Sequence, residues 1–246
     1  MDLCHAQRLD SLAKIVCGRF NSIASGEEFA AIYRAEFLGQ ELQPNHNVAP
    51  TSLVYVLRQT DAKRVVDAMT WGLVPSWSKD KSRAASMINA RSETLSEKPS
   101  FRNLLSKYRC VIPIQGFYEW QVLPSDGGKP RKQAHYISRL DNDVMTLAGL
   151  WTTWKQPDDT LLQTCTIITT EANNKLAEVH HRMPVILERD AVKIWLDETD
   201  TAPLHLLRAT PDDCVECEAT DRLSRTKNPG DAGTAQLGDD AGSRLF

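Results

Sequence analysis

Six short clusters in this sequence place polar or reactive side chains where a core strand or turn would ordinarily be apolar. They contain cysteine, asparagine, glutamate, histidine and arginine, residue types that suit nucleophilic attack, proton transfer and anion binding. In chain order the clusters are Val16-Cys17-Gly18-Arg19-Phe20, Asn47-Val48-Ala49-Pro50, Trp71-Gly72-Leu73-Val74-Pro75, Ile88-Asn89-Ala90-Arg91-Ser92-Glu93, Gly116-Phe117-Tyr118-Glu119-Trp120 and His180-His181-Arg182-Met183-Pro184.

Motifs for cofactors and metals are missing from the sequence. No Walker loop, dinucleotide fingerprint or HExxH occurs. Cys214 and Cys217 form a lone CxxC without a second pair or nearby histidines, and we interpret them as ordinary thiols rather than as a zinc site. We therefore expect no cofactor and no metal.

Taken together and in this order, the six clusters closely resemble the SOS response-associated peptidase (SRAP) family, from Cys17 to about Leu187. The resemblance implies one α+β domain that processes abasic sites in single-stranded DNA, including DNA at replication-fork junctions. It also implies a catalytic cysteine exposed as the N-terminal residue. By position, it assigns the family's active-site residues to Cys17, Asn89, Glu119 and His180.

The chemistry that the resemblance implies explains these residue types. An N-terminal cysteine is a 1,2-aminothiol, which can attack the ring-opened aldehyde of an abasic deoxyribose twice. The amine forms a Schiff base and the thiolate closes a thiazolidine ring, which crosslinks the protein to DNA; β-elimination through the Schiff base would give slow lyase activity. Glu119 then transfers a proton to the departing hydroxyl, and His180 protonates the sugar ring oxygen. Asn89 holds the N-terminus or the substrate by neutral hydrogen bonds.

Each candidate also has a purely structural interpretation. Cys17 beside Phe20 fits a buried thiol, Glu119 fits the water-facing side of a strand, and Asn89 fits a turn. Either adjacent histidine can face the site. We favour His180 over His181, because the second position of this motif varies in the family.

Basic and aromatic residues of the same clusters are the expected DNA contacts. The resemblance makes Arg19 and Arg91 phosphate clamps. Trp77, on a Pro-bounded loop, is expected to stack on an unpaired base, whereas Trp71 fits the core equally well. The complete expected DNA-binding set is Gly18, Arg19, Pro50, Trp71, Trp77, Arg91 and Arg182.

A basic stretch lies within a chain whose formal charge is −3. From Lys79 to Arg109, eight basic residues outnumber three acidic ones. This excess suits local phosphate contact, although a solvated helix face would show it too. The basic residues are Lys79, Lys81, Arg83, Arg91, Lys98, Arg102, Lys107 and Arg109.

The position of Cys17 is the main departure from the family pattern, in which cysteine directly follows the initiator methionine. One explanation is a mistaken start, with a GUG start codon read as Val16. The other is a leader cut autocatalytically between Val16 and Cys17. We therefore expect a leader over 1–16, an SRAP domain over 17–226 and a disordered, Gly-, Ala- and Asp-rich tail over 227–246.

The expected elements indicate the fold class. Helical spacing predicts helices over 26–38, 99–108, 171–179 and 189–197. Runs rich in β-branched and aromatic residues predict strands over 52–58, 64–71, 110–114, 117–122, 134–139, 144–151, 161–170 and 184–187, with hairpin loops at 124–128 and 156–159. This content predicts an α+β domain built on a mainly antiparallel, barrel-like sheet with flanking helices.

Composition limits the class of protein further. A chain of 246 residues that is 41% apolar can form one domain with a sizeable core. It contains no apolar run long enough to span a bilayer, and its six cysteines are widely spread. We expect a monomeric, nucleoid-associated bacterial protein of the reducing cytoplasm, with no membrane partner. The alternatives to an abasic-site sensor are a self-processing cysteine peptidase and a non-catalytic module that binds single-stranded DNA.

Overall fold

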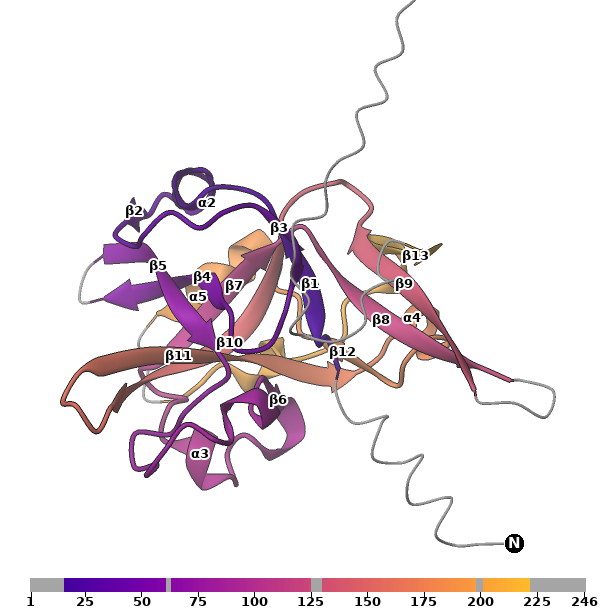
Figure 1. Ribbon diagram of the computed structural model, residues 1–246. Helices are drawn as coiled ribbons and strands as arrows, with labels where there is room; N and C mark the ends of the chain where they lie inside the picture. The colour runs from indigo at the N-terminus through magenta and orange to yellow at the C-terminus, as the bar shows by residue number, and fades with distance from the viewer. Residues whose placement is uncertain (1–15, 61–62, 125–129, 198–200, 222–246) are drawn as a thin grey trace, which may run out of the picture.

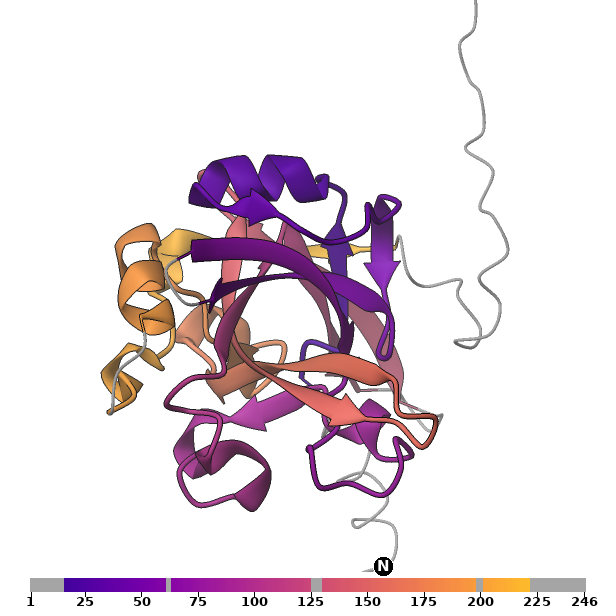
Figure 2. The same cartoon turned by 90° about the vertical axis from the view of Figure 1, so that its left-hand side faces the viewer.

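A closed ring of strands forms the centre of the protein, and Figure 2 looks into it. β4 (Leu53–Thr60) pairs antiparallel with β5 (Lys63–Trp71) and β7 (Arg109–Ile114). β7 pairs with β10 (Met145–Lys155), β10 pairs with β11 (Leu161–Glu171), and β11 returns to β5 in parallel. The β11–β5 contact therefore closes an otherwise antiparallel barrel. The computed structural model (Figure 1) describes residues 16–60, 63–124, 130–197 and 201–221.

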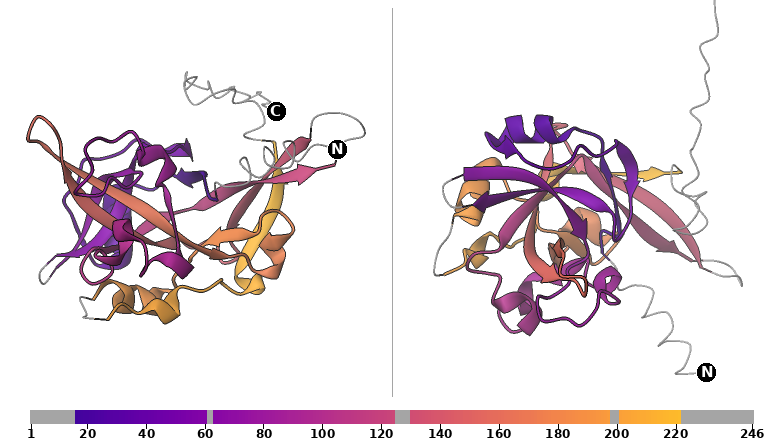
Figure 3. Two further views of the ribbon diagram at one scale, coloured as in Figure 1. Left: turned by 90° about the horizontal axis from the view of Figure 1, so that it is seen from below. Right: turned by 60° about the vertical axis from the view of Figure 1, so that its left-hand side comes forward.

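A second sheet lies beside the barrel, and its β8–β9 hairpin extends away from it (Figure 3). The strand order is β13 (Val215–Thr220), β9 (Arg131–Arg139), β8 (Gly116–Leu123), β1 (Arg19–Ser22) and β3 (Asn45–Val48). β1 has antiparallel partners on both sides, β8 and β3. This pairing brings the chain that precedes β1 against β8.

Short elements complete the wall of the barrel. β2 (Glu36–Phe37) adds to β5, while β6 (Asn89–Arg91) and β12 (Arg182–Pro184) both add to β11. The helices are α2 (Gly26–Tyr33), α3 (Pro99–Arg102), α4 (Asn174–Ala177) and α5 (Arg189–Leu196), with 3-10 turns η1 (Ala84–Ser86), η2 (Ser92–Thr94), η3 (Leu204–Leu206) and η4 (Asp212–Cys214). None of the helices in the described residues is long and apolar enough to cross a membrane.

The core has two layers that follow the alternation of strand side chains. Along β4, Val54 and Val56 join one buried cluster with Trp71, whereas Tyr55 and Leu57 join another. The second cluster also takes the buried faces of α2 and α5. Both faces of these strands are therefore covered, which explains why they read as continuous apolar runs.

The expected fold class is confirmed: the strands form a mainly antiparallel barrel with flanking helices. The expected hairpin loop over 156–159 is also confirmed, between β10 and β11. The loop expected over 124–128 lies largely outside the described residues, as does the expected tail over 227–246.

Helix ends differ from the expected ones. The helix expected over 26–38 ends at Tyr33, because Arg34 takes a left-handed conformation with a φ of 51° and caps the helix. The helix expected over 99–108 ends at Arg102. Strands β1, β2, β3, β6 and β13 lie outside the predicted runs; the first four have at most four residues each and carry little periodic signal.

Arg109 corrects the expectation that the whole basic stretch suits phosphate contact. Its side chain is buried, and its guanidinium donates to the backbone carbonyl oxygens of Leu105, Ser106, Trp195 and Asp197. Arg109 therefore ties β7 to the end of α5, and the other seven basic residues of the stretch remain exposed.

Replacing Arg109 with methionine is expected to lower the free energy of unfolding by about 2–4 kcal/mol, because buried carbonyl oxygens lose their donor. Urea denaturation at neutral pH measures this. Arg102→Met removes an exposed cation from the same stretch and is expected to change stability by less than about 0.5 kcal/mol. Equal losses in the two variants would contradict the structural role of Arg109.

Candidate active site

Cys17 lies two residues before β1, the strand that pairs with β8. Arg19 pairs with Tyr118 and Phe20 with Phe117, so the antiparallel register brings Cys17 next to Glu119. The backbone N–H of Cys17 donates to Oε1 of Glu119. Cys17 is fully buried and has a φ of 46°, a left-handed conformation that is rare outside glycine. The turn thus holds the cysteine backbone against a buried carboxyl.

Asn89 holds the other side of the same peptide bond. β6 places it beside β11, where it pairs with Ile167. Its side-chain Nδ2 donates to the carbonyl oxygen of Val16. Its Oδ1 is buried and has no hydrogen-bond partner among the described residues. The Val16–Cys17 peptide bond is therefore held at its oxygen by Asn89 and at its nitrogen by Glu119.

Burial controls the ionisation of both reactive groups. Burial raises the pKa of Glu119 to about 8, although hydrogen bonds from the backbone N–H groups of Cys17 and Trp120 oppose the shift. Burial also raises the pKa of the Cys17 thiol well above its ordinary value, and the negative charge of Glu119 adds to this. At neutral pH, with Cys17 inside the chain, both groups hold their protons.

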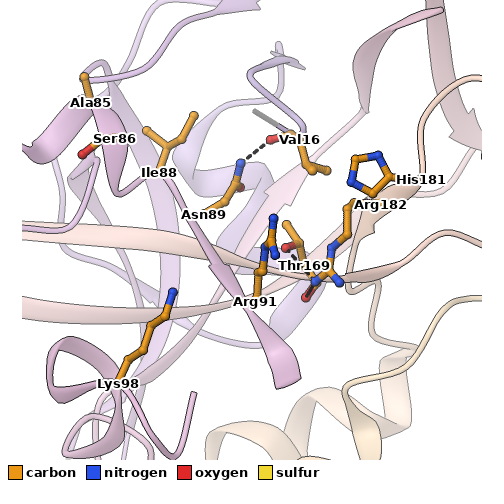
Figure 4. A pocket seen from close by; sticks show the side chains of 10 residues that line it. All are labelled: Val16, Ala85, Ser86, Ile88, Asn89, Arg91, Lys98, Thr169, His181 and Arg182. Atoms are coloured by element: carbon orange, nitrogen blue, oxygen red, sulfur yellow. Dashed lines mark hydrogen bonds between the residues drawn. The ribbon is translucent and has the colours of Figure 1, made fainter. Parts of the chain in front are cut away.

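A cavity of about 140 Å³ opens next to Val16 (Figure 4). Arg91 and Lys98 give it a positive wall, and neither forms an ion pair within the part of the chain that the structure describes. Lys98 was expected only as a member of the basic stretch. The lining residues are Val16, Ala85, Ser86, Ile88, Asn89, Arg91, Lys98, Thr169, His181 and Arg182.

The two histidines take different positions. Their rings stack with centroids 4.5 Å apart, and His181 lines the cavity. Nδ1 of His180 lies 3.1 Å from the backbone nitrogen of Arg182, which donates to it, and 3.2 Å from the carbonyl oxygen of the same residue. Nδ1 can therefore accept a hydrogen bond when neutral and donate one when protonated. The assignment to His180 remains a prediction.

Arg182 uses its charge within the protein. Its guanidinium forms a paired contact with the Glu93 carboxylate, at 2.8 and 3.0 Å, and donates to the Thr169 carbonyl oxygen at 2.8 Å. Only 8% of its side chain is exposed. Since one planar guanidinium joins η2, β11 and β12, Arg182 fixes the wall of the cavity. Its expected contact with DNA remains a prediction.

The remaining expected DNA contacts differ in their exposure. Arg19 is half-buried and donates to Oδ1 of Asn47 at 2.9 Å. Gly18 and Pro50 are half-buried. Trp77 is 68% exposed on its loop, which is fixed where Trp154 donates to the Ser78 carbonyl oxygen at 2.7 Å.

Trp71 is a core residue, and the expectation that it contacts a base is corrected. It is fully buried, its ring packs against Phe20 at 4.8 Å, and its indole N–H donates to the carbonyl oxygen of Ile88 at 3.0 Å. With no exposed ring face, Trp71 has no surface on which a base can stack. It instead supports the segment that leads to Asn89.

Metal ligands are not grouped in the described residues, where no cluster of His, Cys, Asp and Glu could hold a metal ion. The two cysteines of the CxxC have different neighbours. The Cys217 thiol lies 3.7 Å from Nδ1 of His135, and the Cys214 thiol lies 3.8 Å from Oδ1 of Asp213.

Comparison with known proteins identifies the family. The family model "SOS response associated peptidase (SRAP)" matches residues 16–223, so the chain belongs to the SRAP family. The chain is 36% identical over 217 residues to "Abasic site processing protein YoqW" of Bacillus subtilis, which covers 87% of this chain and 95% of that protein.

Other proteins are similar over 63% and 88% of the chain. "Abasic site processing protein HMCES" of Gallus gallus is 36% identical over 184 residues, which covers 63% of this chain and 54% of that protein. A crystal structure of a protein from Bacteroides thetaiotaomicron is similar with a TM-score of 0.75 and 26% identity, over 88% of this chain and 97% of that one.

Stability is expected to fall as the pH rises from about 5 to about 8. In this window folded Glu119, with a pKa of about 8, keeps its proton. The unfolded carboxyl, with a pKa near 4.3, has lost its own, so the native state binds more protons and the free energy of unfolding decreases with pH. Glu119→Gln removes this titration and is expected to flatten the dependence by about 3–4 kcal/mol over this window.

Urea unfolding at both ends of the pH window measures this difference. Glu218→Gln, at an exposed position of β13, is the matched control and is expected to keep the wild-type pH dependence. A Glu119→Gln variant with the wild-type slope would show that Glu119 does not titrate in this range.

Proposed function

We propose that this protein recognises abasic sites in DNA and attaches to them covalently through Cys17. Its membership of the SRAP family and its similarity to proteins named for abasic-site processing support the reaction class. The observation that carries the proposal is the pair of contacts on the Val16–Cys17 peptide bond, which gathers a thiol, a buried carboxyl and a carboxamide beside a positively charged cavity.

Removal of Val16 would connect Cys17 to the cavity. Val16 lines the cavity, whereas Cys17 lies behind it and is fully buried. A chain that begins at Cys17 presents a free amine and a thiol where Val16 now lies, and Asn89 loses the carbonyl oxygen that it binds. The Asn89 amide is then available to a substrate oxygen at the same place.

The reaction proceeds in two additions. The Cys17 amine adds to the aldehyde carbon and water leaves, which gives a Schiff base. The thiol then adds to the imine carbon and its proton passes to the nitrogen, which closes the thiazolidine. Glu119, held beside the Cys17 nitrogen, donates a proton to the departing hydroxyl. His180 or His181 protonates the sugar ring oxygen and so opens the ring; β-elimination from the Schiff base is a slower side reaction.

Release of Cys17 follows from the same geometry. We propose that the Cys17 thiol attacks the Val16 carbonyl carbon, with Asn89 donating to the developing oxyanion. Glu119, next to the Cys17 nitrogen, delivers the proton that lets the amine leave and takes up the proton that the thiol loses, and water hydrolyses the thioester. The proposed leader over 1–16 lies outside the described residues apart from Val16, and a start at Val16 would reach the same mature end.

DNA binding is proposed along the positive side of the cavity. Arg91 and Lys98 supply cations beside the reaction centre, and exposed Trp77 supplies a ring for stacking. Single-stranded DNA at replication-fork junctions, a monomeric state and a location at the nucleoid in the cytoplasm belong to the same proposal.

Two alternative functions predict different outcomes from the proposed one. A self-processing peptidase would cut before Cys17 without binding DNA, and a single-strand binding module would bind without an adduct. Cys17→Ala is expected to abolish both processing and crosslinking while leaving non-covalent DNA binding intact.

The intact mass of the purified protein, before and after incubation with single-stranded DNA that carries one abasic site, tests the proposal. We expect a mass that begins at Cys17 and a heat-stable adduct. An unprocessed mass, with no adduct even for a variant that starts at Met-Cys17, would refute it.

Replacing the two cationic side chains of the cavity, Arg91 and Lys98, is expected to weaken DNA binding and to make the binding constant less dependent on salt concentration. In an Arg91→Gln, Lys98→Gln double variant, the slope of log K against log salt is expected to become smaller by about 1.4, or about 0.7 for each phosphate contact on a single strand. Fluorescence anisotropy with a labelled oligonucleotide measures it. Lys193→Gln, on α5 and paired with Asp197, is the control and should keep the wild-type slope.

A further inference from the structure

Gln121 connects the second sheet to the segment that carries the two histidines. Its Nε2 donates to the carbonyl oxygen of Glu178 at 2.8 Å. Its Oε1 lies 3.3 Å from Nε2 of His135. Glu178 caps the end of α4, and His180 and His181 follow two and three residues later. One half-buried amide thus joins β8 and β9 to the start of the histidine segment.

A chain of contacts extends this link across the sheet. Nδ1 of His135 lies 3.7 Å from the thiol of Cys217 on β13. With Nδ1 facing the thiol, Nε2 of His135 can donate to Gln121, which leaves the Gln121 amide hydrogens for the Glu178 carbonyl oxygen. The contacts therefore run from β13 through β9 and β8 to α4.

The rest of α4 is held by other contacts. At its beginning, Asn173 accepts from the Leu176 backbone N–H at 2.9 Å and donates to the Thr210 carbonyl oxygen at 3.0 Å. Along its side, Lys175 donates to the Val215 carbonyl oxygen at 2.6 Å. At the end of α4 the Leu176 carbonyl oxygen accepts from the backbone N–H groups of Val179 and His180, whereas the Glu178 carbonyl oxygen has no helical partner. Gln121 donates to this carbonyl oxygen, at the end of α4 nearest the histidines.

The alternation of strand β8 gives this contact a mechanistic consequence. Glu119 and Gln121 are two residues apart, so their side chains share a face of the sheet. Their partners on β9 are His135 and Gln133. Glu119 contacts the Cys17 backbone directly, whereas Gln121 reaches the histidine segment through Glu178. One strand thus sets the positions of both proposed proton donors relative to each other.

We propose that Gln121 is a positioning residue for ring opening, which holds the histidine pair so that it can protonate the sugar ring oxygen of the abasic site. This rests on the proposed function. Loss of the contact releases the end of α4 and misplaces the imidazoles, and proton transfer depends steeply on such placement. The later steps at Cys17 do not use the histidines and are unaffected.

Two lesions separate the ring-opening step from the rest. Single-turnover adduct formation is measured on single-stranded DNA with a natural abasic site, and on an oligonucleotide whose lesion is an acyclic aldehyde without a ring oxygen. Gln121→Ala is expected to slow the first reaction by about tenfold and to leave the second within about twofold of wild type. Gln121→Glu can accept from His135 but cannot donate to Glu178, and it is expected to behave like Gln121→Ala.

Gln133→Ala is the matched control, because Gln133 faces Gln121 on β9 but donates to the carbonyl oxygens of Ala134 and Thr220. It is expected to react with both lesions at the wild-type rate. A Gln121→Ala variant that matches wild type on the natural lesion, or that slows both reactions equally, overturns the inference. Failure of the wild type to react with either lesion would instead refute the proposed function.

Discussion

The antiparallel pairing of β1 with β8 is the constraint on which the site depends. It places the backbone N–H of Cys17 against the carboxyl of Glu119, so that this buried group accepts a hydrogen bond from a residue about a hundred positions away in the chain. The carboxyl is buried because β8 continues from β7 and so passes from the barrel into the second sheet. Burial at the junction between the two sheets thus raises the pKa of this carboxyl.

Charge around the cavity is divided between binding and structure. The charge of Arg182 is neutralised by Glu93, and its hydrogen bonds hold the wall of the cavity together. Arg91 and Lys98 have no such acidic partner among the described residues. Arg182 is buried while the Glu93 side chain is 46% exposed, and the two parallel hydrogen bonds between them fix the geometry of the wall. The unpaired cations keep their attraction for a phosphate, so neighbouring residues of the same charge take different roles.

The same division holds for the aromatic residues. Trp71 is fully buried and supports the approach to Asn89, while Trp77 projects from a loop that Trp154 secures. The buried tryptophan stabilises the core, whereas the exposed tryptophan on an anchored loop leaves a ring face open for stacking. The loop is therefore anchored at Ser78 and exposed at Trp77.

The sequence alone determined the family and the fold class, because reactive residues stand in short motifs of fixed order and because long buried strands carry strong apolar runs. Only the tertiary structure decided that Trp71 and Arg109 are internal, that Arg182 pairs with Glu93, and that His181 lines the cavity. These outcomes depend on partners far apart in the chain. A residue's type fixes which interactions it can make, but burial and the nearest opposite charge decide which of them it makes, and both exist only after the strands have paired.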